Sequence, residues 1–508
     1  MNAIPPRLDR CLVFCIPFFL AAGGVAGEGG VRDIGNRRQV FVDRTLIESS
    51  RNVRRNANPP RRAGEILIAP EEPWETAHEK AMIGVYSSVL QEDGKVRVWY
   101  DLIVPTGDGP YDHQRRVCYA ESADGIHFTK PKLGLHQIDG SNANNVVLPG
   151  VIGGCAVWVD PNAPPEHRYK TQAKVYPSGR LLMHSSPDGL RWKEFAELKI
   201  GPGGWDTQTV VHWDPDIERY VMYTRRWVRP PGDKHAQYRA VRRLESEDLL
   251  VWTGETTVLE ADEIDLATYR TPAGQPPVDF YGASVFRLPE SGGSVVMLAQ
   301  AFWHFLPTQR EGHLGPSTFD VRLCLSRDGK TFERADNRQP FMGLGPAGGF
   351  DSRWVWAMPN PIRMGDEIYI YYVGSNRDHN DALDPASPGG RVQTGISRAV
   401  MRLDGFISVD APYEGGEFVT PTVRFRGKRL ELNVDTGAGG SVRVELLDPT
   451  GEPIEGFSGD DAVPLLGNSV RLPVIWKDQA NTEELAGRPV KLRFTMREAK
   501  LYSFQFHD

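Results

Sequence analysis

The chain has 508 residues, which is enough for about three ordinary domains or for one large domain and a smaller one. It contains 52 Gly and 39 Pro, and 10% of its residues are aromatic. This mixture disfavours a helical bundle and a disordered chain, and it favours many short strands joined by turns. The formal net charge is −7 with no basic stripe, which argues against nucleic acid as a partner.

Residues 1–26 have the pattern of a signal peptide. Arg7 and Arg10 precede an apolar run over residues 11–22, and Gly24 and Ala26 supply small residues before a cleavage site. The run is shorter than the ~18 residues that a membrane-spanning helix requires. We therefore expect an exported mature protein, secreted or periplasmic, with no stable membrane span.

One motif recurs along the chain: Asp-Gly followed after a few residues by an aromatic residue. The third copy has lost the Gly, and the fifth is shorter than the others; the Asp residues are Asp124, Asp188, Asp248, Asp328 and Asp404. Asp-Gly favours a tight hairpin, and two or three strand-like runs precede each copy. Four strands per unit are typical of a propeller blade, with the Asp-Gly hairpin between the third and fourth strands.

The predicted fold class is all-β, with a five-bladed β-propeller followed by a C-terminal β-sandwich. We assign the propeller to residues 75–412 and the sandwich, where short alternating strands follow closely, to residues 413–508. Residues 27–74 form an N-terminal segment with a strand that closes or flanks the propeller. The segment FVDRTLIE (41–48) is the candidate for that strand.

Carboxylates recur in the predicted loops that lead into the innermost strands of several blades. Glu79, Asp206 and Asp279 are the catalytic candidates, because glycosyl transfer needs one carboxyl as acid and one as base or nucleophile. We expect Asp206 to be the base or nucleophile, Glu79 the acid, and Asp279 an assisting residue. Structural alternatives stay open: Asp206 and Asp279 as turn residues, and Glu79 as a partner of Lys80.

The same predicted face carries candidate substrate-binding residues. Trp74, Tyr281 and Trp303 offer flat faces to sugar rings, and Arg225 could hold an acidic group bidentately. Asp351 and Arg353 either bind substrate or form a salt bridge with each other. The remaining candidates, which could equally be polar loop residues, are Glu75 and His78.

The sequence lacks the motifs of other common kinds of catalysis. The sequence has no Gly-x-Ser-x-Gly nucleophile elbow, no Walker-type phosphate loop and no HExxH zinc motif. We predict no metal and no cofactor, since the spacing of the carboxylates does not support a Ca²⁺ site.

The Asp-Gly-aromatic repeat, the exported start and the trailing sandwich resemble the propellers of glycoside hydrolase families 32 and 43. The phrases FVDRTLIE, GSNANNVVL, DTQTVVHWDPDIERYVMYTRRW and LDGFISVDA are similar to uncharacterised exported proteins of planctomycete-type bacteria. The resemblance implies a sugar-cleaving propeller. The family 32 catalytic segments are absent, so it transfers no catalytic residues.

These observations predict an exported glycoside hydrolase that cleaves a poly- or oligosaccharide with paired carboxylates. Whether the chain is an enzyme stays open at this point. The alternatives are a non-catalytic glycan-binding propeller and a cell-surface structural protein. The sugar, the linkage, the stereochemical outcome and the oligomeric state do not follow from the sequence.

Overall fold

The computed structural model describes most of the chain: residues 30–107, 113–152, 156–175, 180–198, 200, 207–229, 237–267, 277–304, 317–335, 337–379, 383–477 and 479–508. The predicted signal peptide lies outside this part. The described chain is nearly all-β, as predicted, with one short α-helix, α1 (Glu263–Leu266), and a few 3-10 turns. None of its helices has the length and apolar character to cross a membrane.

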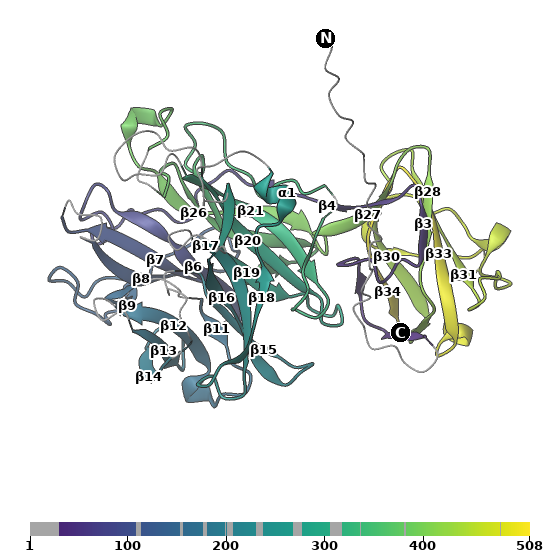
Figure 1. The fold of residues 1–508 in the computed structure, drawn as a ribbon, viewed down its shortest axis with the longest axis horizontal. Helices are drawn as coiled ribbons and strands as arrows, with labels where there is room; N and C mark the ends of the chain where they lie inside the picture. The colour runs from purple at the N-terminus through teal and green to yellow at the C-terminus, as the bar shows by residue number, and fades with distance from the viewer. Residues whose placement is uncertain are drawn as a thin grey trace, which may run out of the picture.

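The strands form two lobes (Figure 1). In the larger lobe, the first three sheets follow one another along the chain. The first sheet has the order β6 (Met82–Glu92), β7 (Lys95–Pro105), β8 (His113–Ser122), β9 (Val146–Pro149). The second contains β10 (Val151–Ile152), β11 (Trp158–Val159), β12 (Tyr169–Val175), β13 (Leu181–Ser186) and β14 (Lys193–Glu197). The third has the order β15 (Val210–Asp214), β16 (Arg219–Val228), β17 (Tyr238–Ser246), β18 (Thr253–Leu259).

The fourth and fifth sheets are joined by a single parallel pair between Phe319 and Trp354. The fourth comprises β19 (Val278–Arg287), β20 (Val295–His304), β21 (Ser317–Ser326) and β22 (Glu333–Arg334). The fifth comprises β23 (Trp354–Ala357), β24 (Ile362–Met364), β25 (Glu367–Ser375), β26 (Thr394–Arg402) and β5 (Arg61–Arg62). The outer strand of the fifth sheet therefore comes from the N-terminal part of the chain.

The repeated motif forms the same hydrogen-bonded turn in four copies. In the first copy, Asp124 Oδ1 accepts from the amides of Ile126 and His127, both at 2.8 Å, and Ser122 Oγ accepts from the amide of Gly125 at 2.9 Å. The turns at Asp188, Asp248 and Asp328 repeat these bonds. The structural role predicted for the motif is confirmed at these four places.

The third turn keeps this geometry without a glycine. Leu249 stands at the glycine position with φ +68°, close to the +72° of Gly125 and the +68° of Gly329. A branched side chain in the left-handed region is strained. Leu249 is only 4% exposed and packs in a cluster with Leu181 and Met183, so burial offsets this strain.

Aromatic side chains link three of the four hairpins to a neighbouring sheet. Trp99 Nε1 donates to the carbonyl of Gly189, and Tyr223 Oη donates to that of Gly329, both at 2.7 Å. Tyr371 Oη, in the fifth sheet, donates to the carbonyl of Gly125 in the first sheet, also at 2.7 Å. The last sheet of the larger lobe is thus in contact with the first.

The smaller lobe consists of two sheets. One has the order β1 (Arg32–Gly35), β29 (Val423–Phe425), β33 (Pro489–Arg497), β28 (Gly416–Val419), β3 (Ser49–Arg51), and β31 (Ser441–Leu447) also pairs with β33. The other has the order β32 (Asn468–Pro473), β30 (Arg429–Asp435), β34 (Ala499–His507), β27 (Ile407–Ala411), β4 (Arg54–Ala57), and β2 (Gln39–Val40) also pairs with β34.

Phenylalanine rings fill the space between these two sheets. Phe418 of one sheet stacks on Phe494 at 4.7 Å, and Phe494 lies 5.5 Å from Phe504 of the other sheet. Phe41 contacts Phe418 at 5.6 Å, edge to face. All four are at most 1% exposed, so they form a close-packed core between the sheets.

The sheets run across the boundaries predicted at residues 74 and 412. Strands β1–β4 pair within the smaller lobe, and β27 also lies there, which places residues from both ends of the chain in both of its sheets (Figure 1). The segment 41–48 is not a strand, contrary to the prediction. It forms turns between β2 and β3. Its apolar side chains Phe41, Val42 and Leu46 are buried in a core that spans both lobes.

Candidate functional site at the entry edge

We call entry edge the edge of the larger lobe at which the first strand of each sheet begins, at Met82, Val151, Val210, Val278 and Trp354. The second strands end at this edge and the third strands begin there, because neighbouring strands within each sheet are antiparallel. The hairpins of the repeated motif lie at the opposite edge. Side chains at the entry edge thus come from segments far apart in sequence.

A buried ionic cluster joins the third and fourth sheets at the entry edge. Asp279 Oδ2 accepts from the backbone amide of Arg239 at 3.0 Å and from its Nη1 at 3.1 Å. Asp279 Oδ1 lies 3.3 Å from Nε2 of His304. The three residues stand near the ends of β19, β17 and β20. The pairing of β19 with β20 and the packing of β17 beside β19 hold one carboxylate between a guanidinium and an imidazole.

The environment of Asp279 favours its charged form. Burial by itself raises the pKa of the carboxyl, but the charge of Arg239 and the contact with His304 outweigh burial, and the net pKa is lowered. The residue is 1% exposed. Asp279 therefore favours its ionised form as an anchor for Arg239 and His304. An ionised carboxylate does not donate a proton, and at 1% exposure Asp279 has almost no surface with which to contact substrate.

Arg239 lies over aromatic faces. Its guanidinium carbon is 4.5 Å from the ring centre of Tyr281 and 4.8 Å from that of Trp227, which are cation–π distances. The Arg239 side chain is 17% exposed, and its buried Nε–H has no hydrogen-bond partner among the described residues. Arg239 thus combines a fixed position with an unused donor.

Aromatic rings form a layer beside this cluster. Phe302 stacks on Phe319 at 4.4 Å, and Tyr281 contacts Phe302, Phe319 and Trp356 at 5.6–5.8 Å. The four rings of this layer, Tyr281, Phe302, Phe319 and Trp356, are at most 5% exposed. Tyr281 is therefore not an open sugar platform, because its ring is covered by protein.

Partly accessible rings border the layer. Trp227 and Trp354 are half-buried, and His379 is exposed, with its ring centre 5.0 Å from Phe302 and 5.5 Å from Tyr281. Because part of each of these rings is accessible to solvent, they can contact a ligand bound beside the buried layer. Arg225 is buried below them, 5.1 Å from the Tyr281 ring and 4.8 Å from the Trp227 ring.

A second buried ion pair lies at the entry edge of the first sheet. Both oxygens of Asp101 accept from Arg115, which also lies 5.3 Å from the ring of Tyr86. Gly84 pairs with Asp101 across the strands, and a Cβ on Gly84 would overlap the Asp101 carboxylate. The absence of a side chain at Gly84 therefore makes room for this pair.

The sequence candidates that precede the first sheet do not gather at the ionic cluster. Glu75 is fully buried, where its carboxylate accepts from Tyr100 Oη, from Lys130 Nζ at 2.6 Å and from the amides of Glu71 and Glu72 at 3.0 Å. Trp74 Nε1 donates to Asn145 Oδ1 at 2.9 Å. Both residues hold their loop in place, and Glu75 has no accessible surface for a ligand.

His78 and Glu79 lie on the same loop. His78 is half-buried and its Nδ1 accepts from the amide of Lys80 at 3.1 Å, and Glu79 is exposed. Asp206 and its neighbour Trp205 lie outside the described residues. The structure therefore does not test the pair of carboxylates chosen from the sequence.

The remaining candidates lie in other contacts. Asp351 accepts from Arg62 Nη1 at 2.8 Å and from Tyr372 Oη at 3.0 Å, and Arg353 lies 3.8 Å from Asp384. The mutual salt bridge, which was the structural alternative to substrate binding for Asp351 and Arg353, is not formed. Trp303 points away from the buried layer, since its ring contacts Arg322 at 5.0 Å.

Sequence reasoning missed Arg239 and the central place of His304. Arg239 and His304 each stand at the entry edge of a strand next to β19. Placing the ends of neighbouring strands and sheets together at this edge was the signal that could have found them. A buried carboxylate at the start of β19 requires a cationic partner. Within the described ranges, no group of three or more His, Cys, Asp or Glu side chains is arranged to hold a metal ion.

Comparisons with known proteins give distant similarities. No family model matches the chain. An "Uncharacterized protein Rv1502" of Mycobacterium tuberculosis is 24% identical over 145 residues, which are 27% of this chain and 45% of that protein. The chain thus spans less than half the length of that relative.

Solved structures cover more of the chain. A β-1,2-mannobiose phosphorylase from Listeria innocua has 13% identity and a TM-score of 0.44, and the match covers 70% of this chain and 98% of that one. An N-acetylgalactosamine deacetylase from F. plautii has 15% identity and a TM-score of 0.43, covering 69% and 96%. A third, described as a glycoside hydrolase, has 14% identity and a TM-score of 0.43, covering 68% and 92%. The resemblance to families 32 and 43 and to planctomycete-type proteins stays a prediction.

Proposed function

We propose that the protein is an exported carbohydrate-active enzyme, a glycoside hydrolase that acts on a poly- or oligosaccharide at the entry edge. In this proposal the five sheets are the blades of a β-propeller and the smaller lobe is a β-sandwich. The observation that carries the proposal is the Asp279–Arg239–His304 cluster, fixed beside an aromatic layer and bordered by Trp227, Trp354 and His379.

The arrangement suits a sugar ligand. Trp227 and Trp354 offer partly open rings for the apolar faces of a sugar ring, and the Arg239 guanidinium, whose side chain is 17% exposed, offers a fixed positive charge for a hydroxyl or carboxylate. Sites built on strand ends and held by buried ion pairs are preorganised, so binding loses little conformational entropy.

We assign three kinds of role. Asp279 is a positioning residue that holds Arg239 and His304, and Arg239 binds substrate. Glu79 and Asp206 remain our candidates for acid and base, because the sequence predicts them in loops of different blades and Glu79 is solvent-exposed. A pair separated by about 5 Å would retain the anomeric configuration, and a pair at roughly 6.5–9.5 Å would invert it.

A non-catalytic glycan-binding protein is the second candidate. The observation that favours it is the engagement of three described candidate carboxylates: Glu75, Asp279 and Asp351 are all buried and paired with Lys130, Arg239 and Arg62. Such carboxylates can shape a binding site but do not supply a proton to a leaving group.

A glycan panel with product analysis separates the two functions. The purified protein is incubated with a panel of poly- and oligosaccharides, and reducing ends and binding are both measured. Glu79→Gln and Asp206→Asn are expected to lose at least a hundredfold in kcat while still binding the responsive glycan, since acid–base groups contribute about 10²–10⁴-fold. Glu247→Gln, an exposed carboxylate at the hairpin edge, is the control that retains activity.

Two results would contradict parts of the proposal. Full activity in Glu79→Gln and Asp206→Asn would reject these residues as acid and base. Binding of a glycan that depends on Arg239, with no turnover of any glycan in the panel, would replace the hydrolase by the glycan-binding function.

A further inference from the structure

A cavity of about 160 Å³ lies where the N-terminal segment meets the fourth sheet of the larger lobe. It is far from the entry edge in the fold, because it borders the hairpin at residues 288–294 and the turn of the fourth copy of the motif. Three arginines line it, Arg32 and Arg37 from the N-terminal segment and Arg327 from the turn. The cavity is thus shared by the two lobes.

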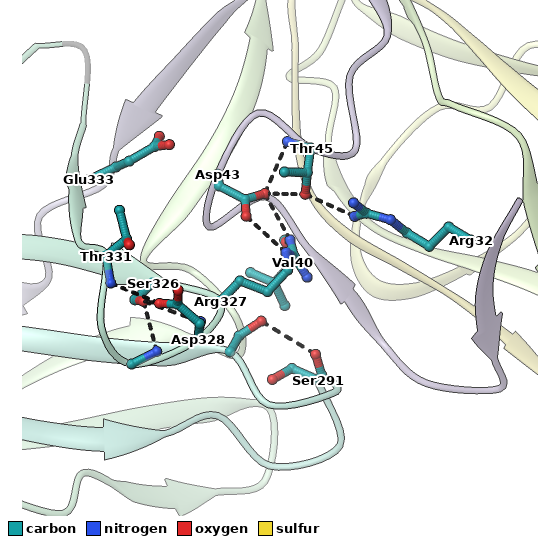
Figure 2. A network of polar contacts seen from close by, with 12 residues as sticks. Arg32, Val40, Asp43, Thr45, Ser291, Ser326, Arg327, Asp328, Thr331 and Glu333 are labelled. Carbon is teal, nitrogen blue, oxygen red and sulfur yellow. Dashed lines mark hydrogen bonds and ion pairs between the residues drawn. The ribbon is translucent and has the colours of Figure 1, made fainter. Parts of the chain in front are cut away.

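The positive charge in this cavity exceeds the negative charge. Asp43 is the buried carboxylate of the network, and it is already engaged by Arg327 at 2.9 and 3.0 Å and by Thr45 Oγ1 at 2.6 Å. Arg32 reaches the network only through Thr45 Oγ1, at 2.8 Å. Figure 2 shows Arg32 and Arg327 approaching the Asp43–Thr45 turn from opposite sides.

The other carboxylate in the lining does not neutralise the excess. Asp33 is exposed, and its Oδ1 accepts from the amide of Gly35 at 2.9 Å. Arg37 donates to the carbonyls of Asp33 and Ile34 and forms no ion pair with a described residue. The three guanidinium groups of this region thus have only two carboxylates near them, Asp43 and Asp33, and Asp33 hydrogen-bonds within its own loop.

Several guanidinium donors are unused. Among the described residues, Arg32 Nε and Nη2, Arg37 Nη1 and Arg327 Nη1 have no hydrogen-bond acceptor. Burial lowers the pKa of Arg32, and the charge of Arg327 lowers it further, because the two cations repel each other. Gly292 also lines the cavity, and its backbone lies against the Arg37 side chain, where a Cβ would be 3.4 Å from Arg37 Cδ.

We propose that this cavity binds a small oxyanion of the sulfate or phosphate type, which bridges the two lobes. Guanidinium groups recognise such anions through paired N–H donors. The volume is well below the ~300 Å³ at which pockets for drug-sized ligands begin, so it suits one tetrahedral anion and excludes a whole oligosaccharide. The anion is either a free ion or the charged end of an ester.

The test measures thermal unfolding of the full chain against inorganic phosphate and sulfate at constant ionic strength. We expect a saturable rise in Tm, because a ligand that binds only the folded state stabilises it. Arg32→Gln and Arg37→Gln should weaken the apparent affinity at least tenfold, and Arg37→Lys, which keeps the charge, should weaken it less. Arg51→Gln is the matched control, an arginine of the same lobe that is 72% exposed and lies outside the cavity.

Sulfate also stabilises proteins without a site, through exclusion from the surface, and that effect does not saturate. Equal, unsaturated shifts in the wild type and all variants would overturn the proposal. If Arg32→Gln fails to fold, Arg37→Gln and calorimetric titration of the wild type with phosphate decide the matter. Absence of binding heat there would equally reject the site.

A second arm identifies the source of the anion. The titration is repeated with a monosaccharide 6-sulfate. Equal affinity for this ester and for inorganic sulfate supports a site that accepts the charged end of a glycan, whereas affinity for the inorganic ions alone supports a site for a free ion. This inference does not depend on the proposed function at the entry edge.

Discussion

Tyr371 donates a hydrogen bond to the carbonyl of Gly125, 246 residues away in the chain, and so ties the fifth sheet to the first. The ring lies against the backbone at a place where a Cβ on Gly125 would come within 2.6 Å of the hydroxyl. The missing side chain of Gly125, together with its φ of +72°, is what makes this contact possible.

Removing this hydroxyl should destabilise the protein. Tyr371→Phe leaves the buried carbonyl of Gly125 without its donor, so we expect a loss of about 1–3 kcal/mol in the free energy of unfolding. The loss is measured by urea denaturation. Tyr413→Phe, which changes a tyrosine that is 61% exposed, serves as the control and should stay within about 0.5 kcal/mol of the wild type. Equal stability of Tyr371→Phe would show that the bond contributes nothing.

The third hairpin offers a test of strain against burial. Leu249→Gly removes the strain of a leucine in the left-handed region, which should raise the free energy of unfolding by about 1–2 kcal/mol. It also removes a buried leucine side chain, which should lower the free energy of unfolding by about 2–5 kcal/mol. The second effect is larger, so we expect a net destabilisation of about 1–3 kcal/mol. A higher urea midpoint in Leu249→Gly would mean that strain dominates at this turn.

The acid sensitivity of the fold should depend on His212. Burial lowers the pKa of this residue to about 3, and its ring stacks on Tyr223 at 5.9 Å. The unfolded chain takes up a proton near pH 6.5, and the folded protein does not until about pH 3. The stability that the neutral His212 provides is therefore complete above pH 6.5 and is lost as the pH falls between these values.

His212→Phe keeps a ring against Tyr223 and removes the titrating group. We expect the stability of the wild type to fall more steeply than that of the variant below pH 6.5, by at most about 1.4 kcal/mol per pH unit for one proton. Urea midpoints at pH 7.5, 6, 5 and 4 measure the difference. Parallel curves for the two proteins would contradict the assignment.

Arg239 should control the response of the candidate site to its ligand. Arg239→Lys keeps a positive charge beside Asp279 but loses the planar group that lies over Tyr281 and Trp227. On a glycan that the wild type converts, we expect kcat/KM to fall at least tenfold while Tm changes little. Unchanged kinetics would show that Arg239 has only a structural role.

The C-terminal residues alone should not form the smaller lobe. A fragment of residues 413–508 lacks β27 and β1–β4, which supply strands to both sheets. We expect its circular dichroism spectrum to lack sheet signal and the fragment to be digested rapidly by protease. Joining residues 30–58 to residues 405–508 through a short linker should restore the sheets. A folded 413–508 fragment would refute this reading of the lobe.

The sequence predicted the repeated turns because their chemistry is local: Ser122 and Asp124 bind amides within three residues. It did not predict that β1 pairs in parallel with β29, since these strands of three or four residues have no clear alternation and lie almost 400 residues apart. The same limit applies to the site. Nothing near Asp279 in sequence identifies Arg239, which the packing of the third sheet against the fourth brings to it. Nothing near Glu75 shows that it forms an ion pair with Lys130.

The N-terminal strands have a consequence for the order of folding. Strands β1–β4 are made early, but their partners in β27, β28, β29 and β34 are completed only when nearly the whole chain exists. Until then their backbone groups are unpaired edges, which are prone to aggregate. Pairings of such high contact order form slowly. We therefore expect the two ends of the chain to meet last, in a slow final phase of refolding.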